Sequence, residues 1–269
     1  MSEILRFGAR GLAVSALQTQ LAKVGHPLEV TAIFDEATEA AVRALQRTSG
    51  LVDDGRVGNK TRAALAGLDT SKLLRESDLV QAAARLGVPV ASVKAVNEVE
   101  SAGSGFLPDG RLCVLFERHV FYARLPDHGI DPAPHFARFP GIVNRKRGGY
   151  AGGAAEYSRL ATAIQISRPA ALEAASWGAF QIMGYHWQRL AYESADDFVN
   201  AQQQSEGAQL AAFVSFIETD PPLHKALIGR KWAAFARGYN GPAYADNLYD
   251  VKLARAYERF AAKATEVAA

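Results

Sequence analysis

Apolar residues recur at helical spacing along most of this chain, and glycines end the successive runs. The segment "GLAVSALQTQLAKVG" stops at Gly25, and its apolar positions are Leu12, Val14, Leu17 and Leu21. Beyond residue 78, further helical patterns cover 154–166, 168–182, 205–218 and 243–263. The stretch "LCVLFE", 112–117, is the one candidate for a short strand or hairpin. The sequence therefore predicts a mainly α-helical protein.

The first 67 residues predict a small unit of three helices. The second helix follows Asp35, a suitable N-cap, and ends at Gly50; the third follows the turn in "DDGRVGNKTRAALAGL". The pair Leu-Gln occurs at residues 17–18 and again at 45–46. Each copy precedes a glycine and a further apolar stretch, which indicates a weak internal duplication.

Length and composition favour two domains. With 269 residues, 49% of them apolar, the chain can bury one sizeable core and a smaller one. The polar stretch "LDTSKLLRESD", 68–78, reads as a linker between a first domain at 1–67 and a second at 79–269. Residues 126–153 are rich in proline, glycine and arginine and predict a long loop.

Several classes of protein are disfavoured. A net charge of +2 does not indicate a nucleic-acid partner. The chain has no run of 18 or more apolar residues, and its start lacks the apolar core of a secretion signal. We therefore expect a protein without a membrane span that is made in the cytoplasm.

The sequence also disfavours several kinds of catalytic chemistry. Cys113 is the only cysteine, so no intrachain disulfide can form, and its apolar surroundings disfavour a cysteine nucleophile. The patterns H-E-x-x-H, paired cysteines and G-x-S-x-G are absent, which disfavours zinc and serine-hydrolase chemistry. We expect neither a metal nor a cofactor.

Two glutamates stand near the end of the helix predicted from Pro89 to about residue 102. At 100° per residue, Glu100 falls about 40° from the centre of the apolar sector, and Glu98 falls roughly 160° away. Glu98 is then a solvated acid. Desolvation and the negative helix end both raise the pKa of Glu100, as a general acid for glycosidic cleavage requires. The alternative is that Glu100 caps a backbone amide or pairs with an arginine.

Residues 9–65 resemble the type 1 peptidoglycan-binding domain found on cell-wall hydrolases. The matching positions are Gly11, Val14, Leu17, Gln18, Leu21, Gly25, Phe34, Thr38, Ala41, Val42, Gln46, Gly50, Leu51, Asp54, Gly55, Val57, Gly58 and Thr61. The segment "TAIFDEAT" departs from the family pattern, which has Asp-Gly before the residue preceding Phe34 and glycine after it. A remodelled first turn is expected there.

Residues 75–265 resemble the N-acetylmuramidases of phage endolysins, within the lysozyme superfamily. Four motifs occur in the family's order: "ESAGSGF", "FERHVF", "SWGAFQIMG" and "YNG". The resemblance implies a three-helix wall-binding domain followed by an α-rich, lysozyme-like catalytic domain. It also implies hydrolysis of the β-1,4 bond between N-acetylmuramic acid and N-acetylglucosamine.

The resemblance also assigns roles to residues. Glu100 becomes the general acid, with Ser101 hydrogen-bonding it or a nearby backbone group. Ser176, Gly178 and Gln181 would line the floor of a sugar cleft, and Tyr239 and Asn240 would contact the sugar and hold the acid. Three aromatic residues could stack on sugars or belong to the core: Tyr150, Trp177 and Tyr185.

Further charged residues are weaker candidates. Glu117 could act on the attacking water of an inverting hydrolase, or pair with an arginine. His119 is expected to be structural, and Glu173 a solvated helix acid. The basic stretch "NRKRGGY", 144–150, reads as solvated loop charge, with anionic wall polymer as the alternative.

The sequence thus predicts a modular endolysin that binds and hydrolyses peptidoglycan as a monomer. It would wait in the host cytoplasm and reach the periplasm through a holin. Two alternatives stay open: a lytic transglycosylase that leaves 1,6-anhydromuramic ends, and an inactive wall-binding structural protein.

Overall fold

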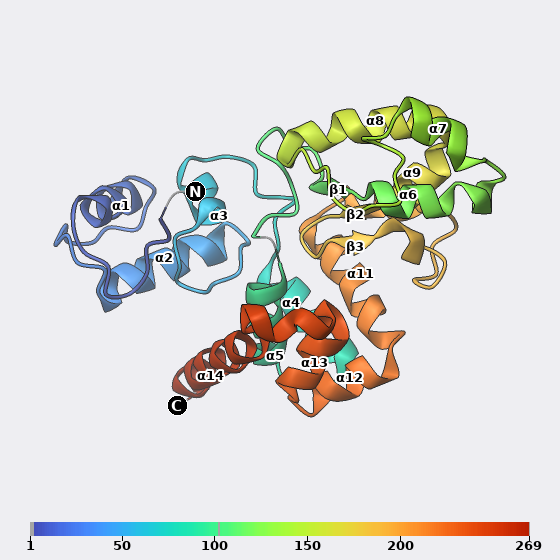
Figure 1. Ribbon diagram of the computed structural model, residues 1–269. Helices are drawn as coiled ribbons and strands as arrows, with labels where there is room; N and C mark the ends of the chain where they lie inside the picture. The colour runs from blue at the N-terminus through green and yellow to red at the C-terminus, as the bar shows by residue number, and fades with distance from the viewer. Residues whose placement is uncertain (1–2, 102, 269) are drawn as a thin grey trace. The chain divides into compact units, whose positions relative to one another are not determined.

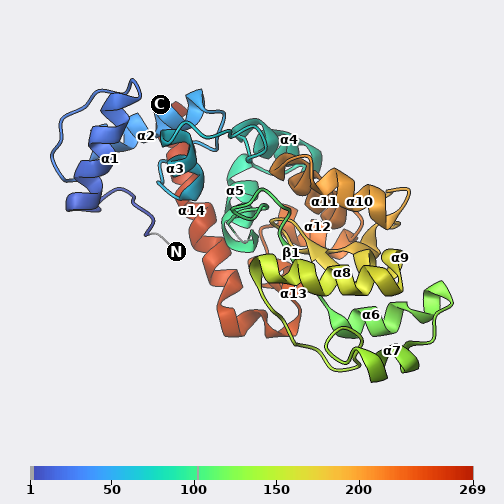
Figure 2. The ribbon, with the colours of Figure 1, turned by 90° about the horizontal axis from the view of Figure 1, so that it is seen from above.

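The structure is a computed structural model that describes residues 3–101 and 103–268. The chain divides into two compact units, Met1–Asp78 and Leu79–Ala269 (Figures 1 and 2). Most of the chain is helical and the single described sheet is small, which confirms the mainly α fold class.

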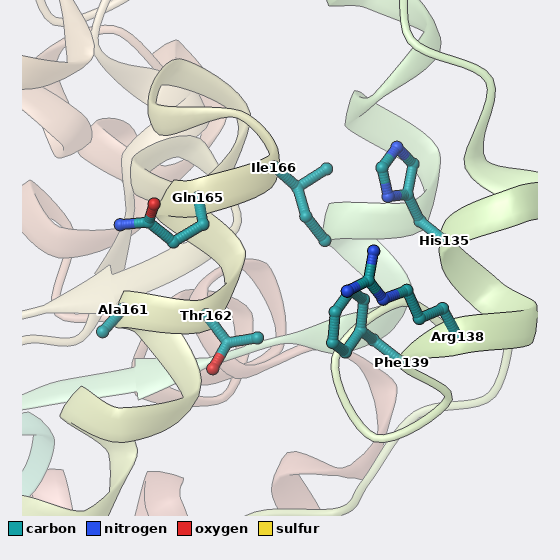
Figure 3. A pocket seen from close by; sticks show the side chains of 7 residues that line it. All are labelled: His135, Arg138, Phe139, Ala161, Thr162, Gln165 and Ile166. Carbon is teal, nitrogen blue, oxygen red and sulfur yellow. The ribbon is translucent and has the colours of Figure 1, made fainter.

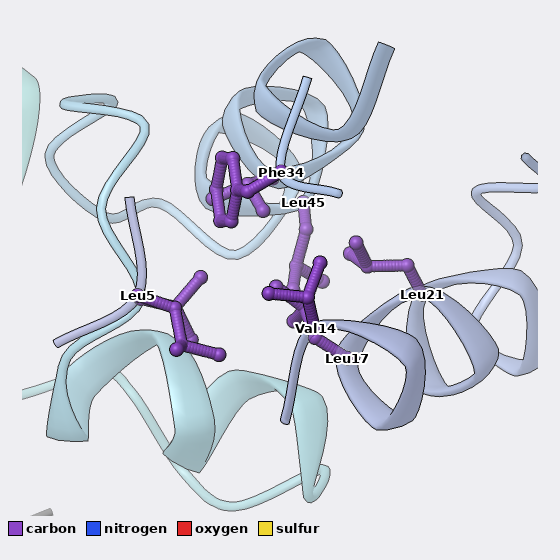
Figure 4. Close-up of a cluster of buried hydrophobic side chains, with 8 residues drawn as sticks. Leu5, Val14, Leu17, Leu21, Phe34 and Leu45 are labelled. Carbon is purple, nitrogen blue, oxygen red and sulfur yellow. The ribbon is translucent and has the colours of Figure 1, made fainter. Parts of the chain in front are cut away.

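The first unit contains three α-helices, α1 (Leu12–Lys23), α2 (Glu36–Thr48) and α3 (Asn59–Leu65). Asp35 caps α2, since its side chain accepts a hydrogen bond from the Thr38 amide. One apolar cluster joins the helices (Figure 4); its buried members are Leu5, Val14, Leu17, Leu21, Phe34, Val42, Leu45 and Val57.

The two Leu-Gln copies make equivalent contacts. Gln18 donates to the Thr38 hydroxyl (2.9 Å) and accepts from the amide of Ala32 (3.0 Å). Gln46 donates to the Thr61 hydroxyl (3.1 Å) and accepts from the amide of Gly55 (2.9 Å). Both glutamines are almost completely buried. The internal duplication is therefore a repeated lock between a helix and the loop and helix that follow it.

The second unit holds the remaining helices. Helix α4 begins just before the boundary, and the helices run in the order α4 (Glu76–Leu86), α5 (Val90–Glu100), α6 (Arg118–Arg124), α7 (Pro132–Arg138), α8 (Glu156–Ile166), α9 (Arg168–Glu173), α10 (Ala195–Gln202), α11 (Glu206–Glu218), α12 (Pro221–Ile228), α13 (Trp232–Asn240) and α14 (Tyr249–Ala268). Short 3-10 turns lie at Pro126–His128, Gly153–Ala155, Gly184–His186 and Pro242–Asn247.

An antiparallel sheet lies among these helices. Its strands are β1 (Val114–Phe116), β2 (Ala175–Trp177) and β3 (Ile182–Met183), in the order β1-β2-β3. Leu115 lies opposite Ser176, and Ser176 lies opposite Met183. Helix α8 packs against β1 and α9 against β2, whereas α5 and α13 each pack against α14 elsewhere in the unit (Figure 1).

Parts of the secondary-structure prediction are wrong. Helix α7 lies inside the loop expected at 126–153, because Asp131 caps it and Pro132 supplies a favourable first turn. The helix expected at 168–182 ends at residue 173, and the rest forms the β2–β3 hairpin. That stretch is buried on all sides, so its apolar run carries no distinguishing period.

Among the described residues, no single helix has the length and apolar character needed to cross a membrane. Helices α4 and α5 have this length and apolar character only when taken together, and the chain bends by 112° between them.

Candidate active site

Glu100 ends α5 and contacts the last residue of α13. The side-chain amide of Asn240 donates to both carboxylate oxygens of Glu100, at 3.0 and 3.2 Å. The two residues stand 140 positions apart in the chain. The structure thus joins the "ESAGSGF" and "YNG" motifs in one hydrogen-bonded pair.

The environment of Glu100 favours its protonated form. Burial raises the pKa of the Glu100 carboxyl to about 7, although the Asn240 hydrogen bond acts in the opposite direction. At neutral pH a large fraction of this carboxyl therefore carries a proton. A carboxylic acid in that state can protonate a leaving oxygen.

Glu98 lies on another side of α5. It is exposed, and its carboxylate accepts a 2.6 Å bond from Arg259 of α14. The two acids, separated by one residue, thus face different surroundings, as the helical geometry predicts.

Tyr239, the residue before Asn240, connects the surroundings of Glu100 to the sheet. The Tyr239 hydroxyl donates to the carbonyl oxygen of Phe180, in the turn between β2 and β3 (2.9 Å). Burial raises the pKa of the Tyr239 hydroxyl well above its usual range, so it remains a donor. Consecutive residues of α13 therefore hold Glu100 and the turn that carries Gln181.

The sheet has a core face and a second face. Val114, Phe116, Trp177 and Ile182 are at most 6% exposed, and Ser176 and its cross-strand neighbours point the other way. The Ser176 hydroxyl donates to Oε1 of Gln181 (2.8 Å), and the Gln181 amide donates to the Gly178 carbonyl oxygen (2.8 Å). Three of the predicted floor residues thus form one network on this face.

Two residues that sequence reasoning missed fix the loops around this network. Gln209 of α11 accepts from the amide of Ala179 (2.8 Å), and a Cβ on Gly178 would lie 2.8 Å from its side chain. Glu206, one turn earlier, accepts from the amide of Gly105 (2.8 Å). Both side chains are 1% exposed. The sequence signal for Glu206 and Gln209 was a polar residue at an otherwise apolar position of the predicted helix 205–218.

Glu117 follows β1 and is 4% exposed. The Tyr150 hydroxyl lies 2.9 Å from each of its carboxylate oxygens. Arg147 is 3.4 Å from one oxygen and His119 is 3.2 Å from the other. Glu117 therefore has an arginine partner, as one of the two sequence interpretations foresaw, and a tyrosine partner that neither foresaw.

The remaining candidates divide clearly. Trp177 is 2% exposed and donates to the Leu172 carbonyl oxygen, so it belongs to the core. The expectation that Glu173 is solvated is wrong, because it is buried against His128 and Trp187, both 3.0 Å away. Burial raises the pKa of the Cys113 thiol, which makes it a poor nucleophile. The role of the Ser101 hydroxyl stays a prediction.

A surface pocket of about 550 Å³ lies between α7 and α8 (Figure 3). It is lined by His135, Arg138, Phe139, Ala161, Thr162, Gln165 and Ile166. None of the predicted site residues lines it. Within the described ranges, no group of three or more His, Cys, Asp or Glu side chains is arranged to hold a metal ion.

Comparisons with known proteins agree with this geometry. Residues 89–261 match the family model described as N-acetylmuramidase. The chain belongs to the N-acetylmuramidase family. The muramidase region is preceded by a match to a putative peptidoglycan binding domain at residues 10–65.

A solved structure resembles this muramidase over almost its whole length. The crystal structure of the Burkholderia AP3 phage endolysin shares 53% sequence identity, with a TM-score of 0.89. The match covers 96% of this chain and 99% of that chain. No curated protein matches the muramidase significantly. The family assignment makes the chain a glycoside hydrolase and confirms the family resemblance of both regions.

Proposed function

We propose that this muramidase is a modular endolysin that hydrolyses the bond between N-acetylmuramic acid and N-acetylglucosamine, with Glu100 as general acid. The supporting observation is the pKa of Glu100, raised to about 7 by burial, in a site that joins three of the four motifs. The similar crystal structure is that of a phage endolysin, which adds support to this proposal.

We assign a separate role to each residue of the site. Protonated Glu100 donates its proton to the glycosidic oxygen, and Asn240 then stabilises the carboxylate that remains. Ser176, Gly178 and Gln181 form the floor against which the glycan lies. Through its hydrogen bond to Phe180, Tyr239 keeps the floor in a fixed position relative to Glu100.

The role of Glu117 as a second catalytic carboxylate stays a prediction, and its alternative is that the carboxylate only holds Tyr150 in place. Its buried position beside Tyr150 and Arg147 supports a fixed orientation. An inverting enzyme would place its two carboxyl groups about 6.5–9.5 Å apart, with water between them.

The first unit is proposed to anchor the enzyme to the wall. We assign wall binding to residues 1–67, a linker to 68–78 and catalysis to 79–269. A pocket of about 260 Å³ in the first unit is lined partly by Gln20, Lys23 and Arg62. Two cationic side chains beside an amide suit the carboxylates of peptidoglycan stem peptides. Tethering of this kind raises the local concentration of substrate.

The cellular setting is part of the same proposal. A monomeric enzyme would accumulate in the host cytoplasm and reach the periplasm through a holin, with peptidoglycan as its only polymeric partner. We propose no nucleic-acid partner, metal or cofactor.

Product analysis tests the proposed reaction. Digestion of purified peptidoglycan should release new reducing ends at N-acetylmuramic acid, detected by mass spectrometry after borohydride reduction. Products with 1,6-anhydro ends would identify a lytic transglycosylase instead. No change in the turbidity of outer-membrane-permeabilised cells would indicate an inactive wall-binding protein.

A further inference from the structure

The second face of the sheet, which carries Ser176, continues to another polar cluster. Glu117 lies one residue beyond β1 with an extended backbone, and its amide donates to the Ala174 carbonyl oxygen (2.9 Å). The alternation of side chains along the strand therefore puts Glu117 on the same face as Leu115 and Ser176. At about 3.3 Å per residue, Leu115 and Glu117 are separated by roughly 7 Å. The Gln181 network therefore occupies one end of this face, and Glu117 with Tyr150 occupies the other.

The loop that carries Tyr150 is firmly held despite its glycines. Arg118 donates to the carbonyl oxygens of Lys146 (2.8 Å) and Arg147 (3.1 Å). Gly149 has a φ of +78°, and a Cβ there would lie 3.0 Å from the Arg118 guanidinium. Only glycine fits this position easily, because both the backbone angle and the close approach disfavour a side chain.

A second buried acid fixes the other side of the loop. The carboxylate of Glu156, 0% exposed, accepts from the amides of Ala151 (2.6 Å) and Gly152 (2.9 Å). Its other oxygen accepts from Arg159 (2.6 Å) and from the amide of Phe116 in β1 (3.3 Å). Glu156 thus binds the loop directly to the sheet.

Tyr150 is fixed at its hydroxyl and open at its ring. Its hydroxyl binds buried Glu117, yet the residue is 44% exposed. Of the other two aromatic candidates, Trp177 is in the core, and the Tyr185 ring lies 4.9 Å from the Arg124 guanidinium. An exposed ring with a fixed orientation loses little conformational entropy when it binds a ligand.

We propose that Tyr150 is a platform for one sugar ring of the glycan strand, and that Glu117 is the positioning residue that holds it. The apolar C–H face of an N-acetylhexosamine would pack on the tyrosine ring, which removes apolar surface from water. This inference rests on the proposed muramidase reaction, because it assigns a further binding subsite for the same substrate.

Steady-state kinetics of the full-length enzyme on soluble, uncross-linked glycan strands tests the proposal. Tyr150→Ala should raise KM by about five- to tenfold with kcat within about twofold of the wild type. Phe136→Ala is the matched control, since Phe136 is also 44% exposed and lies on α7. This control should leave both constants unchanged.

A double-mutant cycle tests the link to Glu117. Tyr150→Phe keeps the ring but removes the hydroxyl, so it should raise KM by about two- to fivefold. Glu117→Ala should raise KM similarly, and the two changes together should cost no more than either alone. Glu117→Gln should recover most of the loss, because its amide oxygen can still accept from the Tyr150 hydroxyl.

The outcomes separate this inference from the proposed function. If the wild-type enzyme released no reducing ends, the muramidase reaction itself would fail. If it did, but Tyr150→Ala kept the wild-type KM, the platform would be overturned. A loss of kcat by about 100-fold in Glu117→Gln, at unchanged KM, would make Glu117 a catalytic base and overturn its positioning role.

Discussion

Gln209 occupies the space that any side chain at Gly105 would need. A Cβ on Gly105 would overlap the Gln209 amide, while Gln209 itself binds the β2–β3 turn through Ala179. The last glycine of "ESAGSGF" is thus explained by a residue 104 positions later in the chain.

We expect Gly105→Ala to lower the free energy of unfolding by about 1–3 kcal/mol, because buried overpacking forces backbone or side-chain shifts. Activity should fall with it, since the loop after Glu100 must move. Thermal unfolding and lytic rate measure the two effects. Gly141→Ala is the control, because a Cβ there meets no atom within 4 Å. Equal melting temperatures for the two variants would contradict the clash.

The two acids of α5 should differ sharply on substitution. Glu100→Gln removes the proposed general acid and should reduce kcat by about 100- to 10,000-fold with little change in melting temperature. Glu98→Gln removes the ion pair with Arg259 and should retain most activity. The rate of reducing-end release compares them. Similar losses in both variants would refute the assignment to Glu100.

The pH dependence of the enzyme should report the Glu100 carboxyl. A general acid works only when protonated, so kcat/KM should decline as pH rises through about 7, the pKa of this group. Asn240→Ala removes a hydrogen bond that lowers this pKa, so the declining limb should move to higher pH. A shift to lower pH would show that Asn240 does not stabilise the carboxylate.

Removal of residues 1–67 should separate binding from cleavage. The first unit has its own apolar core, so the remaining chain should still cleave soluble glycan strands. Its co-sedimentation with insoluble wall should fall markedly, because the proposed anchor is lost. Undiminished co-sedimentation would place wall binding in the second unit.

The repeated glutamine lock predicts a stabilising substitution. Ala32 and Gly55 are equivalent in the two copies, and their φ angles are +61° and +73°. This left-handed conformation costs a non-glycine residue about 1–2 kcal/mol, partly offset by the entropy that glycine loses. Ala32→Gly should therefore raise the free energy of unfolding by about 0.5–1 kcal/mol, measured by urea denaturation. Gly55→Ala should lower it.

Sequence reasoning found the parts of the site whose signal is local. Helical periodicity predicted different surroundings for Glu100 and Glu98, because the geometry of a single helix determines the direction of both side chains. It assigned Glu173 wrongly, because the partners that bury this acid lie 45 and 14 positions away. It also missed Gln209, whose purpose appears only when two distant loops meet at α11.

The fold shows the same limit. The long amphipathic helices were identifiable, whereas helix α7 depends on a cap at Asp131 within a stretch of loop-like composition. The short strands were harder still: β2 and β3 hold three and two residues, too few for a recognisable alternation. These short strands are held in place by the helices that pack against the sheet.

Cys113 has a consequence for the conditions under which the chain can fold. A lone thiol offers no partner within the molecule, and burial raises its pKa and so keeps the reactive thiolate scarce. Folding is therefore independent of redox poise, and the same native state should form in the presence of glutathione or of oxygen. A protein with this property can be produced in one compartment and work in another without oxidative maturation.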